Sequence, residues 1–250
     1  MNSLAVRRSF NRAATSYNSE ADLQRRVCTL LLGQLPTQKP ATVIDAGSGT
    51  GHGLAQLRRL WPQASVNAVD FAPAMLRIAG GGICADIEAL PFAAASFDLY
   101  WSNLTIQWCN TARTFAEAAR VLKPGGQLAV SSLGPGTLIE LRHAFAGIDA
   151  FHHVLDFLPI ADLGAACLAA GLTDVSLSSR SLRTYHPTLR SSLLALKALG
   201  ANQVGGRRRP GLLGRHAWQV IERRYEAHRI AAGLPSTYEV ILCTAAKPTS

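Results

Sequence analysis

The first stretch that could do chemistry is a glycine-rich turn after an aspartate. A short, mainly apolar run over residues 41–44 precedes the aspartate, glycines follow at alternate positions, and a helical leucine pattern begins at Leu54. Glycine permits a tight strand-to-helix turn and lets a ligand touch the backbone. The start of a helix leaves free amides and a partial positive charge beside such a ligand. The pattern predicts a nucleotide-type binding turn made by Asp45, Gly47, Ser48, Gly49 and Gly51.

The spacing of this turn differs from both common phosphate loops. A P-loop contains Gly-Lys-Ser/Thr, whereas no lysine lies between Lys39 and Lys123. The dinucleotide fingerprint is G-x-G-x-x-G, whereas this turn reads D-x-G-x-G-x-G. That form resembles the first motif of class I S-adenosylmethionine-dependent methyltransferases. The resemblance implies S-adenosylmethionine as the cofactor and a Rossmann-like α/β fold, with a seven-stranded, mostly parallel sheet whose last strand is antiparallel.

Two further predicted strands end in carboxylates. Residues 65–70 predict a strand that ends at Asp70, 19 residues after Gly51, which is the distance expected in a βαβ unit. A carboxylate there can accept hydrogen bonds from both ribose hydroxyls, or it can cap the next helix. Residues 83–86 predict a strand ending at Asp86, and the family resemblance implies that this acid binds the adenine amino group while Ile87 packs on the ring. The further cofactor-binding candidates are Asp70, Phe71, Met75, Asp86, Ile87, Ser102 and Asn103.

The rest of the chain predicts a single domain over residues 1–250. N-terminal helices form a lid over 1–36, and the cofactor-binding core spans 37–133, with strands at 96–103 and 127–132 and a turn at 122–126 between them. Later helices are predicted at 137–146, 159–170, 187–199 and 215–232, and later strands at 174–185 and 237–245. Strands six and seven pair antiparallel in a class I fold. The segment 187–235 is therefore predicted to be a helical cap inserted before the last strand.

Composition narrows the class of protein. Of 250 residues 48% are hydrophobic and 16% are charged, which is typical of a globular core. Five scattered cysteines without a C-x-x-C pair predict reduced thiols in a cytoplasmic protein, and no metal-ligand spacing is present. No apolar run reaches the length of a membrane span. The formal charge of +9 predicts either a solvated basic surface or an acidic partner, which could be nucleic acid or protein.

The segment at the end of the fourth predicted strand limits which chemical groups could accept the methyl group. It reads Ser102-Asn103-Leu104-Thr105, whereas enzymes that methylate exocyclic base amines usually carry an Asn/Asp-Pro-Pro-aromatic turn there. No His or Lys lies between Asp70 and Leu122 to serve as a base. A carboxylate is already ionised at pH 7 and needs only desolvation and alignment. These observations favour carboxyl methylation.

The N-terminal segment makes the resemblance more specific. The pattern Phe10-x-Arg12-Ala13-Ala14-x-x-Tyr17, together with Trp101 to Leu104, Gln107 to Cys109 and Gly206-Arg207, is similar to the malonyl-[acyl-carrier protein] O-methyltransferases of biotin synthesis. The resemblance implies methyl transfer from S-adenosylmethionine to the free carboxylate of malonyl-acyl-carrier protein. The ester primes pimeloyl synthesis for biotin. The acidic carrier protein would then be the partner of the basic surface.

The malonyl carboxylate is expected to need a cation near the methyl group. The catalytic candidates are Tyr17, Arg142, Lys197 and Arg207, while Lys123 in the turn before strand five is interpreted as structural. Carrier docking is expected on the Arg207–Arg209 loop and the Arg215 to Arg229 helix, which could equally be a solvated basic face. Another carboxylic acid or a quinone precursor is an alternative substrate. RNA binding by the basic cap is less favoured because the arginines lack interleaved aromatic residues.

Overall fold

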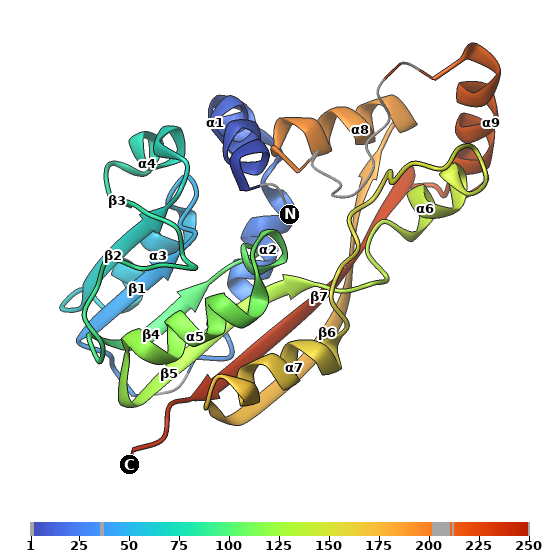
Figure 1. The fold of residues 1–250 in the computed structure, drawn as a ribbon. Helices are drawn as coiled ribbons and strands as arrows, with labels where there is room; N and C mark the ends of the chain where they lie inside the picture. The colour runs from blue at the N-terminus through green and yellow to red at the C-terminus, as the bar shows by residue number, and fades with distance from the viewer. Residues whose placement is uncertain (1–2, 36–37, 202–210, 212, 250) are drawn as a thin grey trace.

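The computed structural model describes residues 3–35, 38–201, 211 and 213–249 as one mixed sheet with helices on both faces (Figure 1). The strand order is β3-β2-β1-β4-β5-β7-β6. The pairs from β3 to β5 are parallel, while β7 runs antiparallel to both β5 and β6. The predicted seven-stranded, mostly parallel fold with an antiparallel last strand is confirmed.

The strands are β1 (Thr42–Ala46), β2 (Ser65–Asp70), β3 (Ile83–Cys84), β4 (Phe97–Ser102), β5 (Leu122–Leu133), β6 (Thr173–His186) and β7 (Leu234–Ala246). The helices are α1 (Ser3–Glu20), α2 (Asp22–Leu32), α3 (His52–Leu60), α4 (Pro73–Ala79), α5 (Thr111–Val121), α6 (Ile139–Phe145), α7 (Ile160–Ala169), α8 (Leu189–Ala198) and α9 (Arg215–Glu226), with a 3₁₀ turn, η1, at Ile106–Trp108. No helix in the described part of the chain combines the length and apolar character that crossing a membrane requires.

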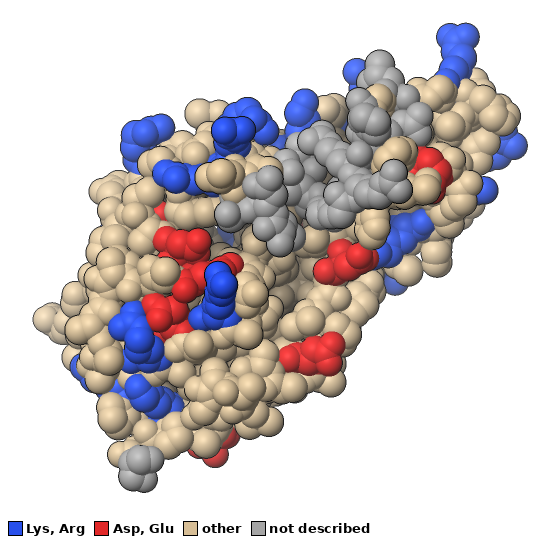
Figure 2. Space-filling model, in the orientation of Figure 1, with Lys and Arg blue, Asp and Glu red and all other residues tan. Residues whose placement is uncertain are grey.

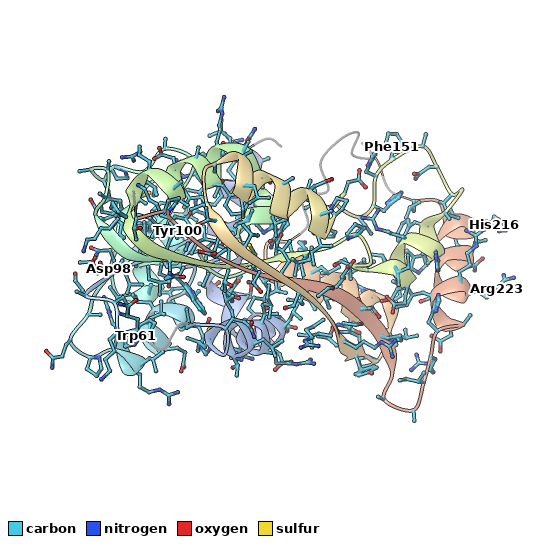
Figure 3. All side chains as sticks on the ribbon, turned by 90° about the horizontal axis from the view of Figure 1, so that it is seen from below. Trp61, Asp98, Tyr100, Phe151, His216 and Arg223 are labelled. Atoms are coloured by element: carbon cyan, nitrogen blue, oxygen red, sulfur yellow. The ribbon has the colours of Figure 1, made fainter. Side chains whose placement is uncertain are left out.

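Alternation along the central strands divides the core between the two faces of the sheet. Successive side chains of a strand point to opposite faces, so Leu99 and Trp101 of β4 pack with α2 and α3, whereas Tyr100 packs with α5 and α7. Figure 3 shows these two layers of helices on opposite sides of the sheet. Because both faces are covered, the central strands are buried and hold the turns at their carboxyl ends rigidly.

Several boundaries differ from the sequence prediction. Strand β3 ends at Cys84, so Asp86 follows this strand instead of ending it. The predicted turn at 122–126 belongs to β5, where the register with β4 shifts between Phe97 and Leu99 and Gly125 adopts a φ of +75°. The glycine accommodates this irregularity without ending the strand. The last helix ends at Glu226 instead of residue 232, and β7 begins at Leu234, because β6 and β7 continue their pairing as far as His186 and Leu234.

Helices α1 and α8 lie side by side above the carboxyl ends of the strands (Figure 1). The Ser16 hydroxyl of α1 donates to the Ala198 carbonyl at 3.0 Å. Helix α8 starts with a capping box in which Thr188 and Ser191 bond each other's backbone amides. Its Ser192 hydroxyl lies 3.0 Å from that of Ser236, which also contacts the Tyr225 hydroxyl. This buried hydroxyl cluster ties α8 and α9 to the start of β7.

The contact between α1 and α8 depends on a glycine. Gly200 has a φ of +73°, and a Cβ there would lie 3.1 Å from the Phe10 ring. We expect Gly200→Ala to lower the free energy of unfolding by about 1–2 kcal/mol, because an L residue is strained in the left-handed region. Denaturant-induced unfolding of the variant and the wild type measures this difference in the free energy of unfolding. Gly33→Ala is the control, since Gly33 has an ordinary φ of −68° and room for a Cβ; an equal loss in both variants would contradict the prediction.

Candidate active site

The glycine turn after β1 is held by the end of β2. The amides of Gly47 and Ser48 both donate to the Val69 carbonyl, at 2.8 and 3.0 Å. Gly47 has a φ of +80°, and a Cβ there would lie 2.2 Å from the Thr105 hydroxyl. Only glycine therefore fits this position, and the turn presents backbone to the space above it.

Asp70 at the end of β2 binds the same turn. Its Oδ2 accepts from the Gly49 amide at 2.9 Å and its Oδ1 from the Ala72 amide at 2.8 Å. Burial, with only 7% of the residue exposed, raises the pKa of this carboxyl, while the two amides oppose the shift. A carboxylate has about four acceptor positions. Each oxygen can therefore accept one more hydrogen bond, for example from a hydroxyl of a ribose diol.

Asp45 at the end of β1 is buried, and its carboxylate oxygens are only partly hydrogen-bonded. It is 2% exposed, and burial, followed by the charge of Asp70, raises its pKa to about 7. Its Oδ2 has no hydrogen-bond partner among the described residues, and the same is true of the Ser48 hydroxyl. Unpaired buried oxygens are costly. Both line one cavity, so a ligand donor there would relieve that cost.

Two adjoining cavities surround the glycine turn. They share Tyr17, Gly47, Gly49 and Asn103 as wall residues. The first is walled by Tyr17, Gly47, Gly49, Asp70, Phe71, Met75, Asp86, Ile87 and Asn103, together with Phe10, Leu104, Thr105 and Trp108. The second is walled by Tyr17, Gln24, Asp45, Gly47, Ser48, Gly49, Gly51 and Asn103, among others. The structure therefore brings eleven of the twelve predicted cofactor-binding residues together around these two cavities.

Ser102, the twelfth, lies beneath this wall. It is fully buried, and its hydroxyl donates to the Ala46 carbonyl at 2.7 Å. The neighbouring Asn103 is positioned by two bonds: its Nδ2 donates to the Gln24 carbonyl at 3.1 Å, and its Oδ1 accepts from the Ser131 hydroxyl at 2.8 Å. Ser102 therefore fixes the strand end, while Asn103 faces the ligand space.

A third cavity lies on the other side of α1. It shares Phe10, Tyr17, Leu104 and Trp108 with the first, and Phe10 packs edge-to-face on Trp108 with ring centroids 5.6 Å apart. Most of its wall is apolar, from Leu138, Leu141, Val154, Leu155, Leu193, Leu196 and Leu199. Its polar wall residues include Gln24, Gln107, Thr137, His153 and Tyr238. The side-chain oxygens of Gln24 and Gln107 have no partner among the described residues.

Tyr17 lines all three cavities. Burial, followed by the nearby Asp70 carboxylate, raises the pKa of its phenol, so the hydroxyl stays neutral and can donate at pH 7. Helix α1 brings it there because Phe10, Ala13, Ala14 and Tyr17 share one face at helical spacing. Among the described residues Tyr17 alone lines all three cavities, and it brings a hydrogen-bond donor to the place where they meet.

Of the predicted cations, the two that the structure describes, Arg142 and Lys197, do not line the third cavity. Arg142 is held by the Leu155 carbonyl and, at 3.3 Å, by Asp156, and it does not line the third cavity. Lys197 is exposed on the outer face of α8. Lys123 pairs with Asp98 at 2.8 Å in the β5 region, as its structural interpretation requires. Arg207 lies outside the described residues. Within the described part of the wall, the third cavity contains no Lys or Arg.

Several wall residues were missing from the sequence candidates. Thr105 comes from the loop after β4, and Gln24 comes from α2. Loop residues carry no periodic pattern, so only their position just after a strand end could have indicated them. Phe10 was visible as part of a motif, but its place in the wall depends on where α1 packs.

Known proteins resemble this chain over most of its length. Residues 44–130 match the methyltransferase domain model. The malonyl-[acyl-carrier protein] O-methyltransferase of Dechloromonas aromatica is 42% identical over 97% of this chain and 94% of its own. The biotin biosynthesis bifunctional protein BioHC of Cellvibrio japonicus is 41% identical over 97% of this chain and 50% of its own. A solved phosphoethanolamine N-methyltransferase 2 of Haemonchus contortus, in complex with S-adenosyl-L-methionine, superposes with a TM-score of 0.58 at 17% identity, over 95% of this chain and 57% of that one.

The raised pKa of Asp45 predicts a pH dependence of stability. Between the ordinary value of 3.8 and about 7, the folded state holds a proton that the unfolded state has released. Stability therefore falls as pH rises through this window, by roughly 4 kcal/mol from this group, and levels off above it. Asp45→Asn removes the titrating group, so its curve of unfolding free energy against pH should be flatter. Asp162→Asn, at an exposed position on α7, is the control; an unchanged slope in Asp45→Asn would contradict the assignment.

Proposed function

The chain belongs to the malonyl-[acyl-carrier protein] O-methyltransferase family, and from that membership we propose that it transfers a methyl group from S-adenosylmethionine to the free carboxylate of malonyl-acyl-carrier protein. The ester then primes pimeloyl synthesis for biotin. The supporting observation is the identity of 42% to the Dechloromonas relative over 97% of this chain and 94% of that one. The biotin context is supported by the name of the Cellvibrio relative.

The residues of the first and second cavities suit the cofactor. Asp70 has acceptor positions for the two ribose hydroxyls, and Phe71, Met75 and Ile87 supply apolar surface for the adenine. Asp45 can accept from the ammonium of the methionine end, because its Oδ2 is unpaired and faces the second cavity. When bound, S-adenosylmethionine supplies an activated methyl group on a sulfonium. These residues would hold the two ends of the cofactor, and Tyr17 lines both of the cavities that would contain it.

The third cavity suits the acceptor. It shares Tyr17 and Trp108 with the first cavity, so an acceptor bound there would lie next to the space proposed for the cofactor. A malonyl carboxylate is ionised at pH 7 and requires no base. The apolar wall would displace water from the carboxylate, and the fixed shape of the cavity would align it with the methyl group. The Tyr17 hydroxyl can donate to the carboxylate. The unpaired oxygens of Gln24 and Gln107 can accept from the amide N–H groups of the pantetheine arm.

A second candidate acceptor is a free, largely apolar carboxylic acid. The apolar wall of the third cavity would accept such a molecule without a carrier protein. It differs from the main proposal in one measurable respect, because its methylation would not depend on acyl-carrier protein.

The proposal is tested by transfer of labelled methyl from S-adenosylmethionine to purified malonyl-acyl-carrier protein. Parallel reactions contain malonyl-coenzyme A, free malonate and unacylated carrier protein. We expect strong labelling of the malonyl carrier, removed by mild base as an ester, and none of the unacylated carrier. Binding of S-adenosylmethionine without labelling of any malonyl compound would reject the substrate while retaining the cofactor.

Tyr17→Phe tests the role of the hydroxyl at the junction. We expect kcat/KM for the malonyl substrate to fall about 10- to 100-fold, because a hydrogen bond to a charged group contributes about 1.5–3 kcal/mol. The dissociation constant of S-adenosylhomocysteine, measured by calorimetry, should change little. Tyr185→Phe, on the exposed part of β6, is the control. Unchanged kcat/KM in Tyr17→Phe would show that the hydroxyl does not act on the acceptor.

A further inference from the structure

The two helices above the third cavity have inner and outer faces of opposite character. On α8, Leu193 and Leu196 point into the cavity, whereas Arg190, Leu194 and Lys197 are exposed. On α1, Phe10 and Tyr17 line the cavities, whereas Leu4, Arg8 and Arg12 are exposed at helical spacing on the other face. We call the outer set, Leu4, Arg8, Arg12, Arg190, Leu194 and Lys197, the α1–α8 surface.

The charge of this surface is almost entirely positive. Helix α1 contains three arginines and one acid, Glu20 at its last position, and α8 contains Arg190 and Lys197 and no acid. Figure 2 shows Lys and Arg side chains along the upper edge of the molecule, where α1 and α8 lie in Figure 1. No ion pair between described residues engages Arg8, Arg12, Arg190 or Lys197. Their charges therefore face solvent uncompensated.

The arginines of α9 are differently placed. Arg224 donates to the carbonyls of Ala144 and Ala146, and Arg229, three residues after the end of α9, pairs with Glu226. Helix α9 also carries Glu222, so its surface has mixed charge. Figure 3 shows Arg223 pointing outward at the end of the molecule formed by α9. Part of its basic character serves to hold the fold together, which leaves less for a partner.

Exposed leucines accompany the cations of the α1–α8 surface. Leu4 is 62% exposed and Leu194 is 54% exposed. A single exposed leucine is ordinary, but here one lies among cations on each of two adjoining helices. Cations around apolar contacts match a partner whose helix presents acids around an apolar residue.

We propose that the α1–α8 surface is where the acidic carrier protein docks. This inference rests on the proposed function, which requires a carrier-bound arm to enter the third cavity. Since α1 and α8 supply both the docking face and the cavity wall, a carrier seated on them is only one helix thickness, about 10 Å, from the acceptor site. An extended arm spans that distance. Uncompensated charges also steer an oppositely charged partner and accelerate its encounter.

Steady-state kinetics with two malonyl thioesters test the docking surface. One substrate is malonyl-acyl-carrier protein, and the other is the malonyl thioester of N-acetylcysteamine, which has no carrier and no phosphate. The variants are Arg8→Glu/Arg12→Glu, Arg190→Glu and Leu194→Ser, all at exposed positions. We expect kcat/KM for the carrier substrate to fall about tenfold or more in the charge reversals, mainly through KM. The small thioester should react at the wild-type rate. Raised salt should reduce the wild-type carrier reaction much more than that of the charge-reversed variants.

The matched control is Arg215→Glu/Arg223→Glu on α9, which makes the same charge change on the other basic helix. It should leave the carrier reaction within about twofold of wild type. If the α9 variant loses carrier activity and the α1–α8 variants keep it, the docking proposal is wrong and α9 is the docking site. If wild-type protein methylates neither thioester, the proposed function itself fails and the docking inference fails with it. Methylation of both thioesters by every variant at wild-type rates would overturn the docking proposal alone.

Discussion

The end of β2 holding the turn after β1 is the interaction on which the site depends. The Val69 carbonyl accepts two amides of the turn, and Asp70 accepts a third from Gly49. Parallel strands end at the same edge of the sheet, so this contact follows from the topology. Asp70 therefore holds the Gly49 amide in place and is itself fixed by this bond. Its oxygens keep further acceptor positions for a ligand. Without these hydrogen bonds the turn would be free to move into the space that the first two cavities occupy.

Helix α1 divides the ligand space into two parts with different chemistry. On one side the walls carry carboxylates and backbone, which suit a nucleoside with a charged amino acid end. On the other side they are rich in leucine. Tyr17 faces both parts. A reaction that joins a cationic donor to an anionic acceptor benefits from such a division, because each reactant is desolvated in its own compartment and they meet only at the junction.

The sequence was most informative where local pattern dictates position. Alternate glycines, strand-end carboxylates and the helical spacing of Phe10 to Tyr17 fix which residues face one space, and the fold then brings them together. Arg142 shows the limit, because its pairing with Asp156 and the Leu155 carbonyl arises from a loop whose path no periodicity encodes. Lys197 shows a second limit of sequence prediction. It lies on the outer face of α8 because the leucines on the other face line the third cavity. Ser102 and Asn103 are adjacent in sequence yet point to opposite sides of one strand end, as the pleat requires.

The most direct test of this account is a crystal structure of the protein with S-adenosylhomocysteine. We expect the ribose hydroxyls within hydrogen-bonding distance of the Asp70 carboxylate, the amino acid end beside Asp45, and the sulfur turned toward Tyr17 with the third cavity left open. A product that binds in the leucine-lined cavity, or that makes no contact with Asp70, would contradict the division of the site on which the account depends.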